Sequence, residues 1–524
     1  MTTPKLASPS LRAPTLLALA FGLAACNSHP IKPVEVTGNS VPLEALPLDV
    51  NRKVDVLLVL DNSGSMGEEQ ANLAANFGPF IERLEQVGAD YRIGIVTTDL
   101  GGPNCPSTPN GGELQASSCL DRPADFVFGQ TDVFEVACSE QCSLGDADLT
   151  LRPTQVAGSD EAAVRPWIES ANGVSNLPEG VDPLTAFQCL APQGISGCGW
   201  ESPLESIARA IDNMNDESRP EYGFLRDDAL LAVLVVTDEV DCSYRPEHED
   251  ALFLSNAFWA DGASYATSAV CWNAGVACSG DPLDCQPADF DDLGQPTDDP
   301  SVAVLHPMSR YLDLLQGVES GKLGDRDVLV SLIAGVPEGY PEVPLVFAAS
   351  DDPDFQELFG IGAGCTSVIG GVEQTAVPPV RLRALAEAFP VGDRGIYSVC
   401  SADYTPAISD IVEGLTIELP PACYGACVRD LDLSTDELDY NCQVSQAIGE
   451  DSEELPECLE GGELPEGADA CWILKSGEQA ALECQVVGQN VEFELVRRYG
   501  VAIPAGANVV AACEVSTLPS IDCP

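Results

Sequence analysis

The chain has 524 residues, and its 83 Asp and Glu against 24 Lys and Arg give a formal net charge of −59 at pH 7. Because this charge repels phosphate backbones, nucleic acid is excluded as a partner, whereas divalent cations are favoured. The hydrophobic content of 45% is enough for folded cores, and the length suggests about two to four domains.

The first 26 residues have the pattern of a bacterial lipoprotein signal peptide. Lys5 and Arg12 give a positive start, and the apolar run at 13–22 is too short for a permanent membrane span. The sequence Leu-Ala-Ala-Cys that ends at Cys26 resembles a lipobox, in which Cys26 becomes the diacylated first residue of the mature protein. An ordinary cleaved signal peptide is the alternative. We expect an exported protein with a lipid anchor in the cell envelope.

Two features follow the predicted cleavage point. Asn27 occupies the position where an Asp retains such lipoproteins in the inner membrane, so the resemblance favours the outer membrane. Residues 27–49 are Pro-rich and polar, which predicts a tether. Once Cys26 is acylated, 20 of the 21 cysteines remain, an even number that could form ten disulfides in an oxidising compartment.

The first folded segment ends in a polar motif. A continuous apolar run at 54–60 predicts a strand that is buried on both faces of a sheet. Asp61, Ser63 and Ser65 follow it, and a helical pattern then continues to Leu84. A carboxylate and two hydroxyls on a strand-to-helix loop suit a hard cation, Mg²⁺ first and Ca²⁺ second. A simple cap of the helix N-terminus is the alternative interpretation of these residues.

This D-x-S-x-S motif after a buried strand resembles the metal-ion-dependent adhesion site of the von Willebrand factor A (VWA) domain family. An apolar run at 229–236 that ends in Thr237-Asp238 resembles the family's later strand and its T-D loop. The resemblance implies that Asp238 completes the metal site. In the family a threonine from an intervening loop also contributes, and the best register here puts Glu201 in its place. A carboxylate at that position would make the cation less electrophilic toward an acidic partner, which favours a closed, structural site.

Alternating strand and helix patterns predict an α/β fold over residues 50–419. The expected architecture is a doubly wound, mostly parallel sheet of the VWA or Rossmann-like type, with ligands at the carboxyl ends of its strands. The further strands are expected at 91–96, 328–334 and 395–399, and the further helices at 205–214, 303–316, 380–388 and 405–416.

Three long segments interrupt this pattern, at 99–195, 240–300 and 336–379. The first two contain several cysteines each, and all three follow strand ends. We expect disulfide-stapled insertions that form the rim of the metal site and determine specificity, with inert loops as the alternative.

Residues 420–524 are predicted to be a separate, small, mostly-β module rich in cysteine. They hold eight cysteines and residues 50–419 hold twelve, so both segments can pair all of theirs internally. The short alternating runs near the C-terminus are consistent with a β-hairpin that turns at 504–506.

These features favour a binding protein over an enzyme. Outside the tether only His248 and His306 could act as a general base, and neither lies in a recognisable nucleophile motif. The resemblance implies an envelope-anchored lipoprotein whose VWA-type domain binds a divalent cation and mediates protein or polysaccharide binding at the cell surface. The alternative is a structural envelope protein in which metal and disulfides only stabilise the fold.

Overall fold

The computed structural model describes residues 43–48, 52–103, 105, 111–159, 161–171, 174–260, 262–323, 327–369, 372–392, 394–417, 419, 422–435, 438–448, 451–459, 462–498, 507–519 and 523. The predicted signal peptide, Cys26 and most of the predicted tether lie outside these residues. No helix in this part of the chain is long and apolar enough to span a membrane.

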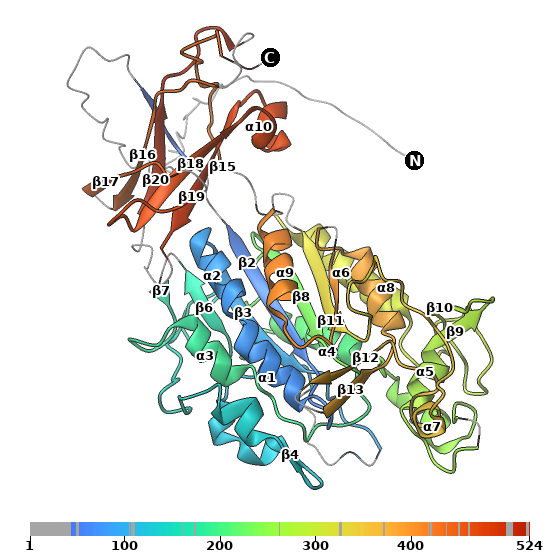
Figure 1. Cartoon of the computed structure of the whole chain (residues 1–524). Coiled ribbons are helices and arrows are strands. Elements are labelled where there is room, and N and C mark those ends of the chain that lie inside the picture. The colour runs from blue at the N-terminus through green and yellow to red at the C-terminus, as the bar shows by residue number, and fades with distance from the viewer. Residues whose placement is uncertain are drawn as a thin grey trace, which may run out of the picture. The chain divides into compact units, whose positions relative to one another are not determined.

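A largely parallel sheet occupies the centre of the α/β part (Figure 1). Within the described residues it has seven strands in the order β14-β11-β8-β2-β3-β6-β7. The first five are parallel to one another, β6 pairs antiparallel with β3, and β7 pairs antiparallel with β6. This confirms the predicted α/β class. The strands are β2 (Lys53–Leu60), β3 (Asp90–Thr97), β6 (Ile168–Ala171), β7 (Val174–Ser175), β8 (Leu230–Val236), β11 (Val328–Ala334) and β14 (Ile396–Ser398).

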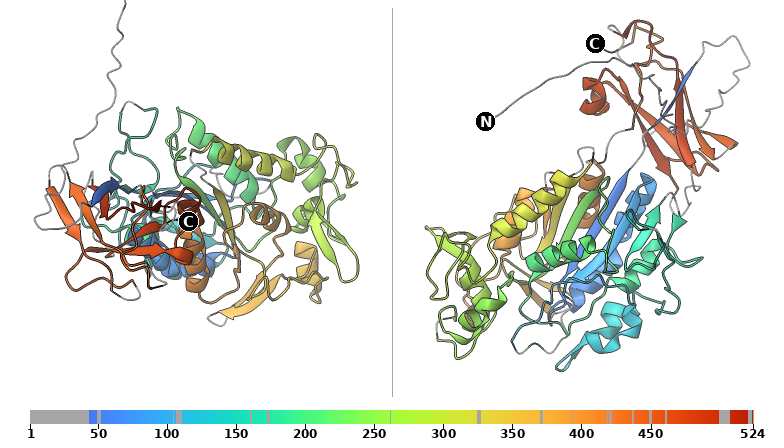
Figure 2. Two further views of the ribbon diagram at one scale, coloured as in Figure 1. Left: turned by 90° about the horizontal axis from the view of Figure 1, so that it is seen from above. Right: turned by 180° about the vertical axis from the view of Figure 1, so that it is seen from behind.

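Helices cover both faces of this sheet (Figures 1 and 2). Because successive side chains of a strand point to opposite faces, Val56 and Leu58 of β2 contribute to one apolar core while Leu57 and Val59 contribute to another. The first core includes side chains of α1 (Gly67–Asn76), α2 (Gly78–Gln86), α3 (Pro183–Leu190) and α9 (Thr405–Ile417). The second includes side chains of α4 (Pro203–Asn215), α6 (Met308–Gly321) and α8 (Val380–Ala388).

The single helix expected after Ser65 is two helices. α1 ends at Asn76, and α2 begins at Gly78 with Pro79 in its first turn. Proline has no backbone N–H and clashes with the preceding turn, so one continuous helix cannot run through this position.

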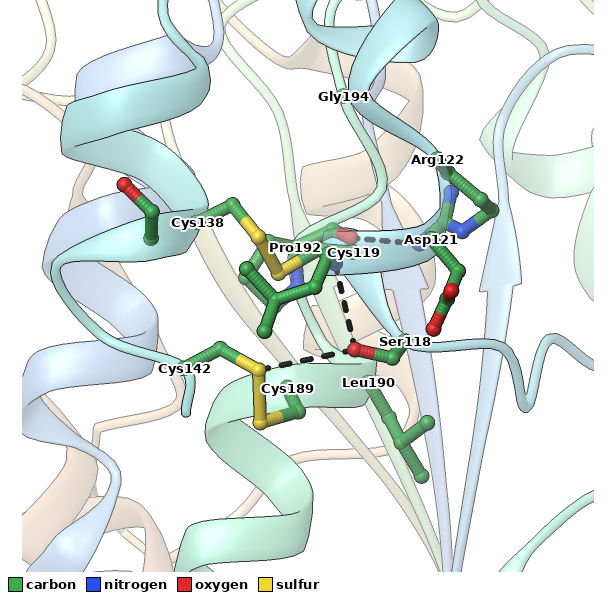
Figure 3. Close-up of a disulfide and its surroundings, with 12 residues drawn as sticks. Ser118, Cys119, Asp121, Arg122, Cys138, Cys142, Cys189, Leu190, Pro192 and Gly194 are labelled. Atoms are coloured by element: carbon green, nitrogen blue, oxygen red, sulfur yellow. Dashed lines mark hydrogen bonds between the residues drawn. A yellow bond between two sulfur atoms is a disulfide. The ribbon is translucent and has the colours of Figure 1, made fainter. Parts of the chain in front are cut away.

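The first insertion is more than a loop, because it supplies β6 and β7 to the edge of the central sheet. Its helical turns are η1 (Cys119–Asp121), η2 (Pro123–Phe126) and η3 (Glu135–Ser139), and a short hairpin joins β4 (Val127–Phe128) to β5 (Thr131–Asp132). Figure 3 shows two neighbouring disulfides of this insertion, the first of which joins η1 to η3. Cys119 is bonded to Cys138 of η3, and Cys142 nearby is bonded to Cys189 of α3. Between them the Ser118 hydroxyl donates to the carbonyl of Leu144 at 2.7 Å.

The second and third insertions pack against each other around a shared apolar core. This core includes Phe253, Phe258 and Trp272 from the second insertion and Phe347 and Ile361 from the third. A disulfide between Cys242 and Cys271 closes the second insertion onto the end of β8. The elements here are η4 (Pro246–His248), η5 (Asp250–Leu254), α5 (Ala269–Gly275), β9 (Val276–Ser279), β10 (Asp284–Pro287), α7 (Pro353–Phe359), β12 (Cys365–Ile369) and β13 (Val372–Ala376).

The C-terminal segment is mostly β, and the described strands form two sheets with the orders β1-β20-β16-β17 and β15-β19-β18. The predicted hairpin is wrong, because β19 and β20 lie in different sheets. The elements are β15 (Ala422–Cys423), β16 (Cys442–Ile448), β17 (Asp451–Leu455), β18 (Ala470–Ser476), η6 (Gly477–Gln479), α10 (Leu482–Val486), β19 (Val491–Arg497) and β20 (Ala507–Cys513).

The end of the predicted tether belongs to this β segment. Strand β1 (Glu44–Pro47) pairs antiparallel with β20, and Leu48 is buried in the same core as Val444 and Phe493. The Tyr424 hydroxyl donates to the carbonyl of Glu44. The tether prediction of 27–49 is therefore too long at its C-terminal end, because a strand of four residues can form wherever an unpaired edge offers its backbone groups.

The predicted cysteine count is confirmed. All 20 cysteines after Cys26 are paired, six disulfides lie within 50–419, and four lie within 420–524. No disulfide joins the two segments, because every cysteine has a partner on its own side of residue 420.

Candidate metal centre

Polar side chains gather where three neighbouring parallel strands end. Asp61 follows β2, Asp99 follows β3, and Asp238 follows β8. β3 lies on one side of β2 and β8 on the other, so the order of strands reverses at β2. In open α/β sheets the crevice outside such a reversal is the usual ligand-binding position.

Asp61 is at the centre of this group and is fully buried. Its Oδ1 accepts a hydrogen bond from the Ser63 backbone N–H at 2.8 Å, and its Oδ2 accepts one from the Thr237 hydroxyl at 2.5 Å. Burial raises the pKa of Asp61, although the bonds from Thr237 and Ser63 act in the opposite direction. The two motifs found separately in the sequence are thus in direct contact.

Ser63 and Ser65 bring two hydroxyls to the same loop. Their Oγ atoms are 3.3 Å apart, and Ser63 is buried while Ser65 is exposed. The helix-cap interpretation of these residues is wrong, because the N-cap of α1 is Met66 and no side chain caps it. The loop therefore presents its hydroxyls to something other than the helix N-terminus.

Asp238 and Glu239 add two acidic side chains from the end of β8. Burial, and then the charge of Asp61, raise the pKa of Asp238 to about 7, while a hydrogen bond from Ser65 lowers it. Asp238 Oδ1 is buried without a hydrogen-bond partner among the described residues. Burial and the charges of Asp238 and Asp61 raise the pKa of Glu239 well above its ordinary value.

Glu201 points into the same group from the loop before α4. It is buried, the Thr98 hydroxyl donates to its Oε2, and its Oε1 has no hydrogen-bond partner within the described part of the chain. Burial, followed by the charge of Asp61, raises the pKa of Glu201 well above its ordinary value. The neighbouring Ser202 points elsewhere, because its hydroxyl donates to the carbonyl of Cys242 at 2.8 Å.

Backbone hydrogen bonds hold this loop against the segments that follow β2 and β3. The Gly197 N–H donates to the carbonyl of Asn62 at 2.9 Å, and the Ser202 N–H donates to the carbonyl of Thr98 at 2.9 Å. A Cβ at Gly197 would lie 2.6 Å from the Asn62 carbonyl. Only glycine allows this close approach, which places Glu201 beside Asp61.

A buried ion pair packs against the C-terminal end of the loop that carries Glu201. Asp241, three residues after Asp238, accepts hydrogen bonds from the Leu204 N–H at 3.2 Å and the Ser243 hydroxyl at 2.6 Å. Its Oδ2 is 2.9 Å from Nε of Arg381, whose side chain is 2% exposed. Asp241 therefore connects the end of β8, the first turn of α4 and α8.

Three acidic residues of the group, Asp99, Glu69 and Glu239, were not predicted as site residues from the sequence. Asp99 is buried after β3, and its Oδ1 accepts from the Gly101 N–H at 2.8 Å. Glu69 in the first turn of α1 is also buried; burial, and then the charge of Asp238, raise its pKa to about 9. Asp99 could have been found from the sequence, because it comes just after a predicted strand, as Asp61 does.

The rim of the site includes an aromatic residue from the first insertion. Phe128 on β4 is 47% exposed. Its ring lies against the backbone of Gly64, so that a Cβ at Gly64 would be 3.0 Å from the ring. The first insertion thus contacts the loop that carries Asp61, Ser63 and Ser65.

The donors of this group are all oxygen atoms, which is the set that Mg²⁺ and Ca²⁺ prefer. In the described part of the chain, no three His, Cys, Asp or Glu side chains are placed to hold a metal ion by themselves. Binding would therefore need the hydroxyls of Ser63 and Ser65 as well. Two buried carboxylate oxygens without partners, on Glu201 and Asp238, fit a site that takes a cation.

No protein-family model matches this sequence, and no curated protein matches it. Among solved structures, the chain is similar to the pilus adhesin SpaC from Lactobacillus rhamnosus GG in its open conformation, with 10% identity and a TM-score of 0.28 over 92% of this chain and 42% of that one. It is also similar to a von Willebrand factor type A protein from Catenulispora acidiphila, with 11% identity and a TM-score of 0.25 over 90% of this chain and 60% of that one.

A third similar structure is the pilus adhesin RrgA from Streptococcus pneumoniae, with 10% identity and a TM-score of 0.21 over 91% of this chain and 58% of that one. The matches thus span less than two thirds of each of these three structures. Similarity at this level assigns no function to the chain.

Proposed function

We propose that the carboxyl edge of the central sheet binds one divalent cation, Mg²⁺ or Ca²⁺, and that the protein is a metal-dependent binding module of the cell surface. Asp61, Ser63, Ser65 and Asp238 would hold the cation, and Glu201 would join them in place of the threonine of the VWA family. The resemblance of the two sequence motifs to that family is the basis for adhesion to a protein or polysaccharide.

One observation carries the metal proposal. Asp61, Asp238 and Glu201 come from three separate segments, and each is buried beside the negative charge of another. Like charges that share a poorly solvated space repel strongly, and a fold that brings them together gains little unless a cation neutralises them. A divalent cation bound there would supply that neutralisation and a Lewis-acidic centre.

Glu201 determines how open the site would be. A carboxylate from the chain itself can occupy the position that a partner's acidic group would take in an adhesive site. The exposed Ser65 and the exposed Phe128 leave one side of the loop accessible. The structural alternative, in which the cation only stabilises the fold, is favoured by the same Glu201, so an experiment has to separate the two functions.

That experiment compares partner capture with thermal stability. Surface proteins and polysaccharides are incubated with the immobilised chain in Mg²⁺, in Ca²⁺ and in EDTA, and the Asp61→Ala variant is treated in parallel. We expect EDTA and Asp61→Ala each to abolish capture. Capture that neither treatment changes would contradict metal-dependent binding. A drop in melting temperature without any change in capture would establish the structural function instead.

We further propose that the chain is anchored to the envelope, in the outer membrane, by a lipid on Cys26. Ten disulfides are typical of exported proteins, because a reducing cytosol would keep the cysteines as thiols. Replacing Cys26 with serine removes the acylated thiol, so we expect the variant to lose all labelling by a radioactive fatty acid in growing cells. Labelling that persists would place the lipid elsewhere or show that the resemblance to a lipobox is coincidental.

A further inference from the structure

A cavity of about 590 Å³ lies between the second and third insertions. Its walls come from the loop before α5, from α5 itself and from the segment around α7. Among the described residues, none that lines the cavity belongs to the candidate metal centre. The volume falls within the range of known small-molecule sites, about 300–1,000 Å³.

One wall is aromatic. Trp259 lines the cavity and packs against the apolar core that the two insertions share. Its indole N–H is buried without a hydrogen-bond partner among the described residues, so packing and not hydrogen bonding fixes the ring. A tryptophan held in this way offers a flat, rigid surface with little loss of side-chain entropy on binding.

Two amide side chains of the lining are oriented by hydrogen bonds to the backbone. Asn273 Nδ2 donates to the carbonyl of Phe258 at 2.8 Å, which leaves its Oδ1 as an acceptor. Gln356 Oε1 accepts from the Ser350 N–H at 2.7 Å, which leaves its Nε2 as a donor. Because each amide is bound on one side to the backbone, its remaining polar atom is held in one orientation. Such preorganised groups favour binding.

The charge of the lining restricts the ligand. Asp351 and Glu357 line the cavity, and none of its described lining residues is Lys, Arg or His. Anionic ligands would be repelled. The two carboxylates would attract a cationic ligand, but it would also meet the amide hydrogens of Gln356 and only one aromatic ring, whereas cation recognition usually encloses the charge in several rings. A purely apolar ligand would leave the amides and carboxylates without partners, at a cost in free energy.

We propose that this cavity binds a neutral saccharide. The apolar C–H face of a pyranose ring can stack on Trp259, while its hydroxyls both donate and accept hydrogen bonds and so match the acceptor on Asn273, the donor on Gln356 and the two carboxylates. This site goes beyond the proposed function, because it requires no metal and lies on the insertions instead of the metal-binding loops.

The test uses the purified chain with three neutral trisaccharides, cellotriose, maltotriose and triacetylchitotriose, in the presence of EDTA. Saturation-transfer NMR detects binding, and isothermal titration measures the affinity. The variants are Trp259→Ala and the exposed Asp351→Ala. Tyr265→Ala is the matched control, because it removes an exposed aromatic ring of the second insertion that does not line the cavity. Circular dichroism checks that each variant is folded.

We expect at least one trisaccharide to bind in EDTA, Trp259→Ala to lower its affinity by at least about tenfold, and Asp351→Ala to lower it by a smaller factor. Tyr265→Ala should leave the affinity unchanged. Three results would each overturn the proposal: no binding of any of the three trisaccharides, binding that neither Trp259→Ala nor Asp351→Ala changes, or a preference for trilysine over the sugars. Binding that occurs with Mg²⁺ or Ca²⁺ but not in EDTA would also overturn the proposal, because the cavity is proposed to need no metal. The separate proposal of a cation site is tested by direct titration with the metals.

Discussion

Replacing Asp61 with asparagine is expected to lower the affinity of the chain for Mg²⁺ and Ca²⁺ by at least about 100-fold. Asparagine keeps the shape of the side chain and an acceptor for the Ser63 N–H, but it removes the charge at the centre of the group. At an effective dielectric constant of about 20, two unit charges about 4 Å apart attract by about 4 kcal/mol, and the cation carries two. Isothermal titration with each metal measures the loss.

A second prediction for Asp61→Asn concerns its thermal stability. Burial raises the pKa of Asp61, which means that the ionised carboxylate is costly at this position without a cation. In EDTA, Asp61→Asn should therefore unfold at the same temperature as the wild type or a higher one. In saturating metal it should lack the stabilisation that a bound ligand gives to the wild type.

Glu201→Thr is the matched control for this site. It restores the hydroxyl that the VWA family has at this position and removes one carboxylate, so metal affinity should fall by less than in Asp61→Asn. If Glu201 closes the site, this variant should also acquire metal-dependent binding of acetate. Unchanged metal affinity in both variants would rule out a cation at this edge of the sheet. Unchanged affinity in Glu201→Thr alone would show that Glu201 is not a ligand.

The strands of the central sheet were predictable because their sequences are continuous apolar runs. Runs at 54–60, 91–96, 229–236 and 328–334 correspond to β2, β3, β8 and β11 within one or two residues at each end. Sequence order also placed Asp61 and Asp238 at one edge, because all parallel strands end on the same side of a sheet. The hydrophobic pattern thus predicts the central strands, because both faces of these strands are buried and their sequences must be apolar throughout.

Elements that depend on a distant partner were missed. β6 is four residues long, and its antiparallel pairing with β3 follows from contacts that no local pattern encodes. β1 contains Glu44 and ends at Pro47, which resembles a tether more than a strand, and only its pairing with β20 reveals it. Local alternation also suggested the wrong partner for β20, since a short gap between two strands does not ensure that they share a sheet.

In the candidate site, too, the features that depend on local sequence were predicted and those that depend on distant contacts were not. The residues of each motif are close together in the sequence, so the pattern alone pointed to them. The orientation of Glu201 instead depends on two long-range backbone hydrogen bonds, from the Gly197 N–H to the Asn62 carbonyl and from the Ser202 N–H to the Thr98 carbonyl. Glu201 and Ser202 are adjacent in sequence, and only these long-range contacts decide which of the two faces Asp61. The pairing of Asp241 with Arg381 was invisible for the same reason, because 140 residues separate them.

Breaking the buried pair of Asp241 and Arg381 is expected to have the second large effect, on the free energy of unfolding. Asp241→Ala is expected to lower the free energy of unfolding by about 3–5 kcal/mol, because it leaves the charge of Arg381 buried without its partner. The side chains are 2% and 0% exposed, so water cannot replace the lost carboxylate. Nη1 of Arg381 already lacks a partner among the described residues, which makes the remaining charge harder to accommodate. Urea denaturation with the disulfides intact measures the change.

Two further variants separate the ion pair from other causes. Glu342→Ala removes the partner of Arg394 in a pair whose side chains are 60% and 47% exposed, and it should leave the free energy of unfolding almost unchanged, because water replaces the lost carboxylate. The double variant Asp241→Leu with Arg381→Met removes both charges, so it should be more stable than Asp241→Ala alone. Because Asp241 also accepts from the Leu204 N–H, its loss should release the loop that carries Glu201 and weaken metal binding. A cost of less than about 1 kcal/mol for Asp241→Ala would mean that water or another acidic side chain reaches Arg381, and the metal affinity should then be unchanged as well.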